Sequence, residues 1–92
     1  MKYEGIVLKR ICNEIGKENG CICVQRGQDQ ILLNVSASIV WAYIDGHMDS
    51  DAIKHNIIQL YQDDNSPEYI SPIIDDSITL LLEEKLIERI GV

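Results

Sequence analysis

The chain has 92 residues, which is enough for one small domain and too few for two. Hydrophobic residues make up 46% of it and charged residues 25%, a composition typical of globular rather than disordered chains. Its formal net charge of −7 disfavours binding to nucleic-acid phosphates or to an anionic membrane surface. No apolar run approaches the roughly 18 residues of a spanning helix, and residues 6–8 are too short for the core of a signal peptide. We therefore expect one soluble, cytoplasmic domain over 1–92, with no nucleic-acid and no membrane partner.

The cysteines and histidines do not form a pattern typical of catalysis. The chain has three cysteines, Cys12, Cys21 and Cys23, and an odd number disfavours a disulfide framework. Cys21 and Cys23 would share one strand face, but no second pair has zinc spacing, so we expect free thiols and no metal. His47 and His55 have no neighbouring Ser or Cys in a nucleophile-like setting. We expect no catalytic residue, no cofactor and no enzymatic activity.

The N-terminal third of the chain has the composition of short strands. Apolar, β-branched runs at 6–12, 21–25 and 30–34 predict three strands. The stretch 13–20 holds two glycines and several polar residues, so we predict a loop there, and 26–29 is a turn. Because the connections are short, the three strands are predicted to form an antiparallel meander.

After residue 34 the apolar period becomes helical. A first helix is predicted with Ser36 as its N-cap, and 45–46 (Asp-Gly) ends it. A second helix opens at Asp49 or Ser50 and is ended by the stretch 62–67.

The third helix has two candidate starts, each a serine followed by proline. Because proline breaks a helix already under way, we predict a loose turn from Pro67 and then a helix from Pro72 to about Lys85. The tail 86–92 is a candidate extended segment. The predicted fold is α+β, a three-stranded antiparallel sheet followed by three helices.

Two features of this fold leave surface to be covered. A three-stranded sheet has open edges, of which the strand 30–34 is one. The third helix is apolar over roughly 200° of its circumference, whereas packing on one core needs about 100°. The residues concerned are Ile70, Ile73, Ile74, Ile78, Leu80, Leu81 and Leu82. Either the helix is buried on two sides within its own fold, or part of it lines a groove that an external peptide fills.

The segment 33–46 resembles the PqqD family. The family pattern runs L-N-x-[ST]-[GA]-x-x-[IL]-W-x-x-[IL]-D-G. The residues that match it in place are Leu33, Asn34, Ser36, Trp41, Asp45 and Gly46, with Val40 and Ile44 as conservative variants. Ala37 and Lys85 stand where the family more often has glycine. The resemblance covers roughly residues 29 to 88.

This resemblance implies a winged-helix-like domain that recognises the precursors of ribosomally synthesised, post-translationally modified peptides. Such a domain holds the leader segment of a precursor peptide and presents the rest to a modifying enzyme, which is a radical enzyme, a cyclase or a protease. It is an adaptor or peptide chaperone and is not itself catalytic. The expected partners are thus a leader peptide and a modifying enzyme.

An edge strand suits this function because its free N–H and C=O groups can pair with an extended leader. We expect leader side chains to enter a cleft between the strand and the third helix. The predicted peptide-binding residues are Gln30, Ile31, Leu32 and Leu33 on the strand, and Ile73, Ser77, Leu80 and Glu84 on the helix. The net charge of −7 either favours a leader carrying Lys or Arg or only keeps the domain soluble.

Three alternatives remain open from the sequence. A DNA-binding winged helix would use the third helix, whose carboxylates at Asp75, Asp76, Glu83 and Glu84 repel phosphates. An acyl or peptidyl carrier protein would use Ser77 in Asp-Ser-Ile, but a carrier has further helices after that serine. The third alternative is a sheet edge that serves homodimerisation, so both a monomer and a homodimer are compatible with the sequence.

Overall fold

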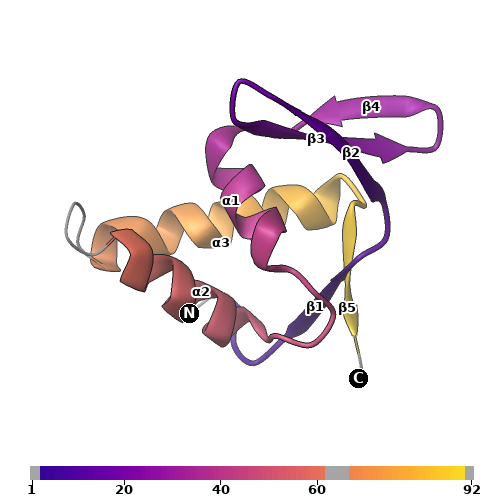
Figure 1. Ribbon diagram of the computed structural model, residues 1–92. Coiled ribbons are helices and arrows are strands. Elements are labelled where there is room, and N and C mark those ends of the chain that lie inside the picture. The colour runs from indigo at the N-terminus through magenta and orange to yellow at the C-terminus, as the bar shows by residue number, and fades with distance from the viewer. Residues whose placement is uncertain (1–2, 62–66, 91–92) are drawn as a thin grey trace.

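The computed structural model describes residues 3–61 and 67–90. It contains an α+β fold with a three-stranded antiparallel sheet, a two-stranded sheet and three helices (Figure 1). In chain order the elements are β1 (Val7–Arg10), β2 (Asn13–Glu18), β3 (Cys21–Arg26), β4 (Asp29–Leu32), α1 (Val35–Tyr43), α2 (Ser50–Tyr61), α3 (Pro67–Glu83) and β5 (Ile87–Ile90). The predicted fold class, α+β with a three-stranded antiparallel sheet followed by three helices, is confirmed.

The strands of the three-stranded sheet are β2, β3 and β4, so the predicted loop at 13–20 is wrong. Glu18 pairs with Cys21, and the two residues between them, Asn19 and Gly20, have positive φ angles of 53° and 82°. Asn-Gly at a two-residue hairpin turn favours these angles, because their twist matches that of the flanking strands. The turn thus makes a strand of a polar segment whose six residues are all exposed.

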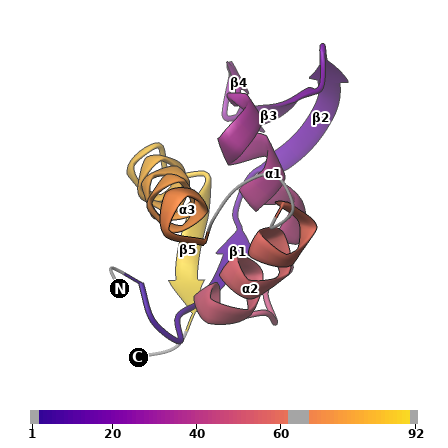
Figure 2. The same ribbon diagram turned by 90° about the vertical axis from the view of Figure 1, so that its left-hand side faces the viewer.

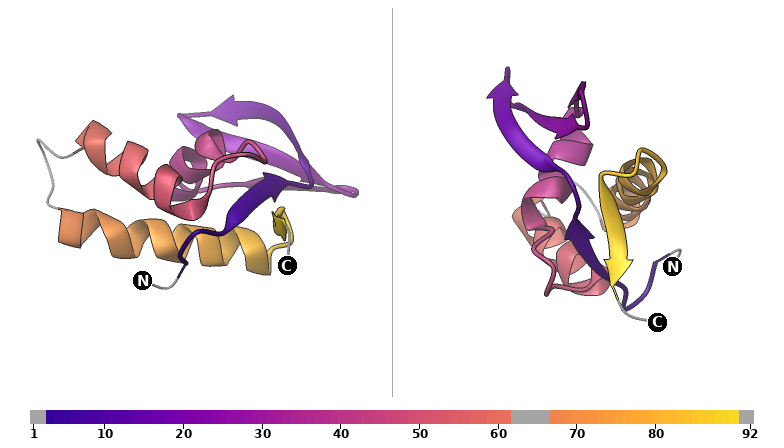
Figure 3. Two further views of the ribbon diagram at one scale, coloured as in Figure 1. Left: turned by 90° about the horizontal axis from the view of Figure 1, so that it is seen from below. Right: turned by 90° about the vertical axis from the view of Figure 1, so that its right-hand side faces the viewer.

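The first predicted strand pairs with the C-terminal tail instead of joining the meander. Val7 lies opposite Ile90 and Arg10 opposite Ile87, so β1 and β5 form a separate antiparallel ladder beside the helices (Figure 3, right). The pairing fully buries Leu8 and Ile87 against the core. The C-terminal tail is therefore extended, as expected. It pairs with the first strand, which was predicted to pair with the strand at 21–25.

Asn34, and not the predicted Ser36, is the N-cap of α1. Its side-chain oxygen accepts a hydrogen bond of 2.8 Å from the backbone N–H of Ala37, which satisfies one of the free amides of the first turn. Ser36 lies inside the helix. The predicted start of α2 is confirmed, since the helix begins at Ser50 and Asp49 accepts a hydrogen bond from the N–H of Ala52. Most of the stretch predicted to end α2, residues 62–66, lies outside the described residues.

Helix α3 runs without interruption from Pro67 to Glu83 with Pro72 inside it, so the predicted break at Pro72 is wrong. Pro72 is exposed, and the helix continues past it because Ile70 and Ile74 on either side are both buried in the core. The loss of one backbone hydrogen bond is thus offset by packing on the opposite face.

The core lies where α1, α2, α3 and the β1–β5 ladder meet. Trp41 of α1 is fully buried, its ring is stacked under Arg10, and its indole N–H donates to Glu14 at 3.2 Å. Figure 2 shows the three-stranded sheet standing above the helices, with α3 seen end-on below β4. Helices α2 and α3 lie side by side (Figure 3, left), joined by a buried ion pair of 2.8 Å between Lys54 and Asp75.

Candidate functional site

Strand β4 is an open edge of the three-stranded sheet. The sheet order is β2-β3-β4, so the second side of β4 pairs with no strand among residues 3–61 and 67–90. The N–H of Leu33 donates to the carbonyl of Ile22 at 2.8 Å, and this fixes the alternation of the ladder. In an antiparallel ladder every second residue directs both backbone groups to its neighbour. The backbone groups of Gln30 and Leu32 therefore point outward, toward the open edge.

A groove lies just past the end of β4, between the start of α1 and helix α3. Its lining residues are Asn34, Ser36, Ile73, Asp76, Ser77 and Leu80. Leu80, which lines the groove, is 39% exposed, and Leu32 on the edge strand β4 is 53% exposed. Exposed large aliphatic side chains that lie near one another can mark a surface that a partner covers.

The structure places three of the eight residues predicted to bind peptide in the lining of this groove and the other five outside it. Gln30 and Leu32 are exposed on the outer face of β4, and Ile31 is half-buried on the inner face, opposite Val24. Ile73, Ser77 and Leu80 line the groove as predicted. Leu33 does not, because it is only 3% exposed and its side chain belongs to the core.

Glu84 does not line the groove, because it is engaged with Arg26 within the protein. Arg26, at the end of β3, donates a hydrogen bond of 2.7 Å to the backbone carbonyl of Glu84. The same guanidinium lies 3.6 Å from the Glu84 carboxylate and 3.7 Å from that of Asp29. The β3–β4 hairpin is thereby fastened to the C-terminal end of α3, so Arg26 sets the spacing of strand and helix there.

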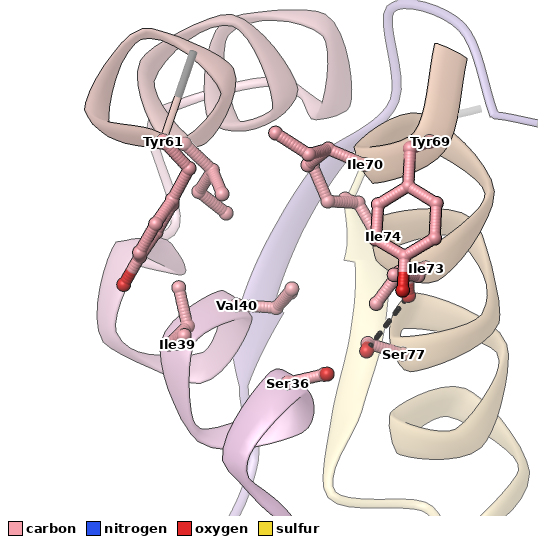
Figure 4. A pocket seen from close by; sticks show the side chains of 10 residues that line it. Ser36, Ile39, Val40, Tyr61, Tyr69, Ile70, Ile73, Ile74 and Ser77 are labelled. Atoms are coloured by element: carbon pink, nitrogen blue, oxygen red, sulfur yellow. Dashed lines mark hydrogen bonds between the residues drawn. The ribbon is translucent and has the colours of Figure 1, made fainter. Parts of the chain in front are cut away.

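An apolar hollow lies beside the groove, between α1, α2 and α3 (Figure 4). The hollow comprises about 480 Å³, part of it open to solvent. Ile39, Val40 and Tyr61 stand on one side and Ile70, Ile73 and Ile74 on the other, with Ser36 and Ser77 facing each other at the bottom of the view. Ser36, Ile73 and Ser77 line both the groove and the hollow, so the two lie next to each other.

The helical half of the chain is strongly acidic. Residues 34–84 contain ten carboxylates and one basic residue, Lys54. Lys54 is buried and paired with Asp75, so its charge is not presented to the groove. Asp76 is exposed and lines the groove directly. A cationic ligand is favoured here over an anionic one.

This geometry also bears on the alternatives. Ser77 is 5% exposed and its hydroxyl donates to the carbonyl of Ile73 at 2.9 Å, which disfavours attachment of a prosthetic arm. Cys12, Cys21 and Cys23 are free thiols, and no group of three or more His, Cys, Asp or Glu side chains gathers among the residues that the structure describes. No helix in the described ranges is long and apolar enough to cross a bilayer.

Four residues, Asn34, Ser36, Asp76 and Arg26, were not predicted from the sequence as part of the site. Asn34 and Ser36 lie in the motif used for the family resemblance, so their position directly after an edge strand was a usable signal. Arg26 gave no such signal, because its contact with Glu84 joins positions 58 residues apart.

Comparisons with protein-family models, curated proteins and solved structures find no match for this chain.

Proposed function

We propose that this protein binds an extended peptide by adding it as an antiparallel strand to β4, so that the peptide also reaches the groove between α1 and α3. The observation that carries the proposal is the open edge of β4, which leads through Asn34 into a groove lined by Ile73 and Leu80. The peptide is the leader segment of a ribosomally synthesised precursor, as the resemblance to the PqqD family implies. The protein then acts as a non-catalytic adaptor that presents the precursor to a modifying enzyme.

Backbone pairing alone does not give useful affinity. Two outward-facing residues offer four backbone groups, each worth about 1 kcal/mol net, or about 4 kcal/mol in all. A dissociation constant in the sub-micromolar to micromolar range requires about 8 to 11 kcal/mol. Leader side chains in the groove must supply the difference, and they also give the selectivity that backbone bonds lack. Leu80 is the central apolar contact on the helix wall.

The direct test is a titration of a fluorescently labelled leader peptide, taken from a precursor encoded beside this gene. We expect binding in the range above and a loss of at least about 1.5 kcal/mol, more than tenfold in affinity, for Leu80→Asp. The matched control is Leu60→Asp, because Leu60 is 61% exposed on α2 and lines neither the groove nor the hollow. Unchanged binding by a folded Leu80→Asp variant would rule out the groove as the peptide site.

A further inference from the structure

We infer that the bound peptide has a second recognition element: one large apolar side chain, placed N-terminal to its strand segment, that enters the hollow between α1, α2 and α3. This inference rests on the proposed function and specifies which peptides the site accepts. It concerns the hollow lined by Ile39, Tyr61 and Ile70, which lies beyond the strand-pairing edge.

The direction follows from the chain geometry. The start of β4 lies near Glu84, because Arg26 contacts both Asp29 and Glu84. The end of β4 leads to Asn34, which faces Ile73 across the groove. A peptide antiparallel to β4 therefore runs from the Ile73 end of α3 toward Glu84. Residues that precede its strand segment lie along the groove in the direction of the hollow.

The spacing follows from helix geometry. From Leu80 back to Ile73 and Ile70, α3 rises by about 10 to 15 Å at 1.5 Å per residue. An extended peptide covers that distance in roughly three to five residues. We therefore place the apolar side chain about three to five positions before the residue that lies opposite Leu32.

The occupant is a peptide continuation and not a separate small molecule because the hollow and the groove share three lining residues. A chain seated on β4 reaches the hollow without leaving the surface. On the way it passes Asp76, whose exposed carboxylate favours Lys or Arg at a position between the strand segment and the apolar residue. The accepted peptides are thus cationic, with an apolar residue ahead of a strand.

The test uses a phage-displayed library of random dodecapeptides selected on the full chain. We expect selected peptides to share one Trp, Phe, Leu or Ile three to five positions before an alternating segment, with Lys or Arg between. Affinity should fall about tenfold for Ile39→Trp, which fills the hollow, and about fivefold for Asp76→Lys. The controls Leu60→Trp and Glu18→Lys make the same changes away from the groove, and with them affinity should stay within about twofold.

A measurement on the peptide keeps the inference testable if Ile39→Trp does not fold. Replacing the apolar residue of a selected peptide by Ala should weaken binding to the unchanged protein about tenfold. If the Ile39→Trp variant folds, it should bind the selected peptide and its alanine-substituted form with equal affinity, because the tryptophan already fills the hollow.

The two proposals fail differently. One outcome would overturn this inference alone: the selected peptides bind Leu80→Asp weakly, but they show no apolar preference and bind Ile39→Trp as well as the unchanged protein. Selected peptides that are insensitive to Leu80→Asp, or a selection that yields none, would overturn strand addition and this inference together.

Discussion

Replacing Arg26 by Met should loosen the groove and destabilise the fold, because this one side chain joins the β3–β4 hairpin to α3. Its 2.7 Å hydrogen bond to the Glu84 carbonyl involves a charged donor, and such bonds contribute about 1.5 to 3 kcal/mol. The Arg26 side chain is 37% exposed, so the lower figure applies, and the two ion pairs at 3.6 and 3.7 Å add at most about 1 kcal/mol. Methionine keeps the apolar stem, so only the polar contacts are lost.

We therefore expect Arg26→Met to lower the free energy of unfolding by about 2 kcal/mol, which is a fall of roughly 8–16 °C in Tm for a domain of this size. Urea unfolding followed by the fluorescence of Trp41, the chain's one tryptophan, gives the measurement. Lys9→Met is the matched control, since the Lys9–Glu88 pair of 3.0 Å is about half exposed on both sides and should cost less than about 1 kcal/mol. Equal losses for the two variants would refute the assignment of Arg26 as the fastening between hairpin and helix.

Two further predictions concern backbone contacts outside the groove. Pro72→Ala should stabilise the protein by about 2 kcal/mol in urea unfolding, because the new N–H can donate to the carbonyl of Glu68. The control Pro67→Ala, at the first helical position, should change the stability little. A destabilised Pro72→Ala variant would contradict this prediction. The backbone N–H groups of Met48 and then His47 donate to Asp45 and hold its pKa below the usual 3.8. Because its pKa is lowered, the ionised Asp45 carboxylate stabilises the fold above pH 3.8, and this stabilisation is lost as the pH falls through the pKa of the folded state. The difference in unfolding free energy between the protein and Asp45→Asn should therefore narrow below about pH 4. A difference that stays constant from pH 6 to pH 2 would contradict it.

The sequence predicted the types of most elements and the antiparallel pairing of 21–25 with 30–34, but not the partner of the first strand. The apolar run at 6–12 does contain a strand, Val7–Arg10, yet its partner Ile87–Ile90 lies at the other end of the chain. Local composition has no information on such a pairing, because alternation specifies a buried face and not a neighbour. The hairpin turn at Asn19-Gly20 could be predicted from the sequence, since this dipeptide is a strong hairpin signal. The polar composition of residues 13–18 led to the prediction of a loop instead.

Part of the candidate site could be predicted from the order of the elements and from their periodicity. The edge strand and the helix residues Ile73 and Leu80 followed from order and periodicity, and the two helix residues line the groove. Leu33 and Glu84 were placed by sequence position alone. Their side chains turned out to be committed to the core and to Arg26, which depends on packing between distant segments.

The wide apolar arc of α3 had two interpretations, and the structure divides it between them. Ile70, Ile74, Ile78 and Leu81 are buried in the core, whereas Ile73 is half-buried and Leu80 is 39% exposed beside the groove. A helix that packed only on its own core would gain nothing from apolar side chains at these two positions, where polar residues would be better solvated. Their place beside an unpaired strand edge, with a hollow at one end and the Arg26 contact at the other, favours a site shaped for an extended chain. The same division explains how one helix can hold the fold together and also carry the surface proposed for the peptide: α1, α2 and β5 contact α3, while Ile73 and Leu80 remain partly exposed.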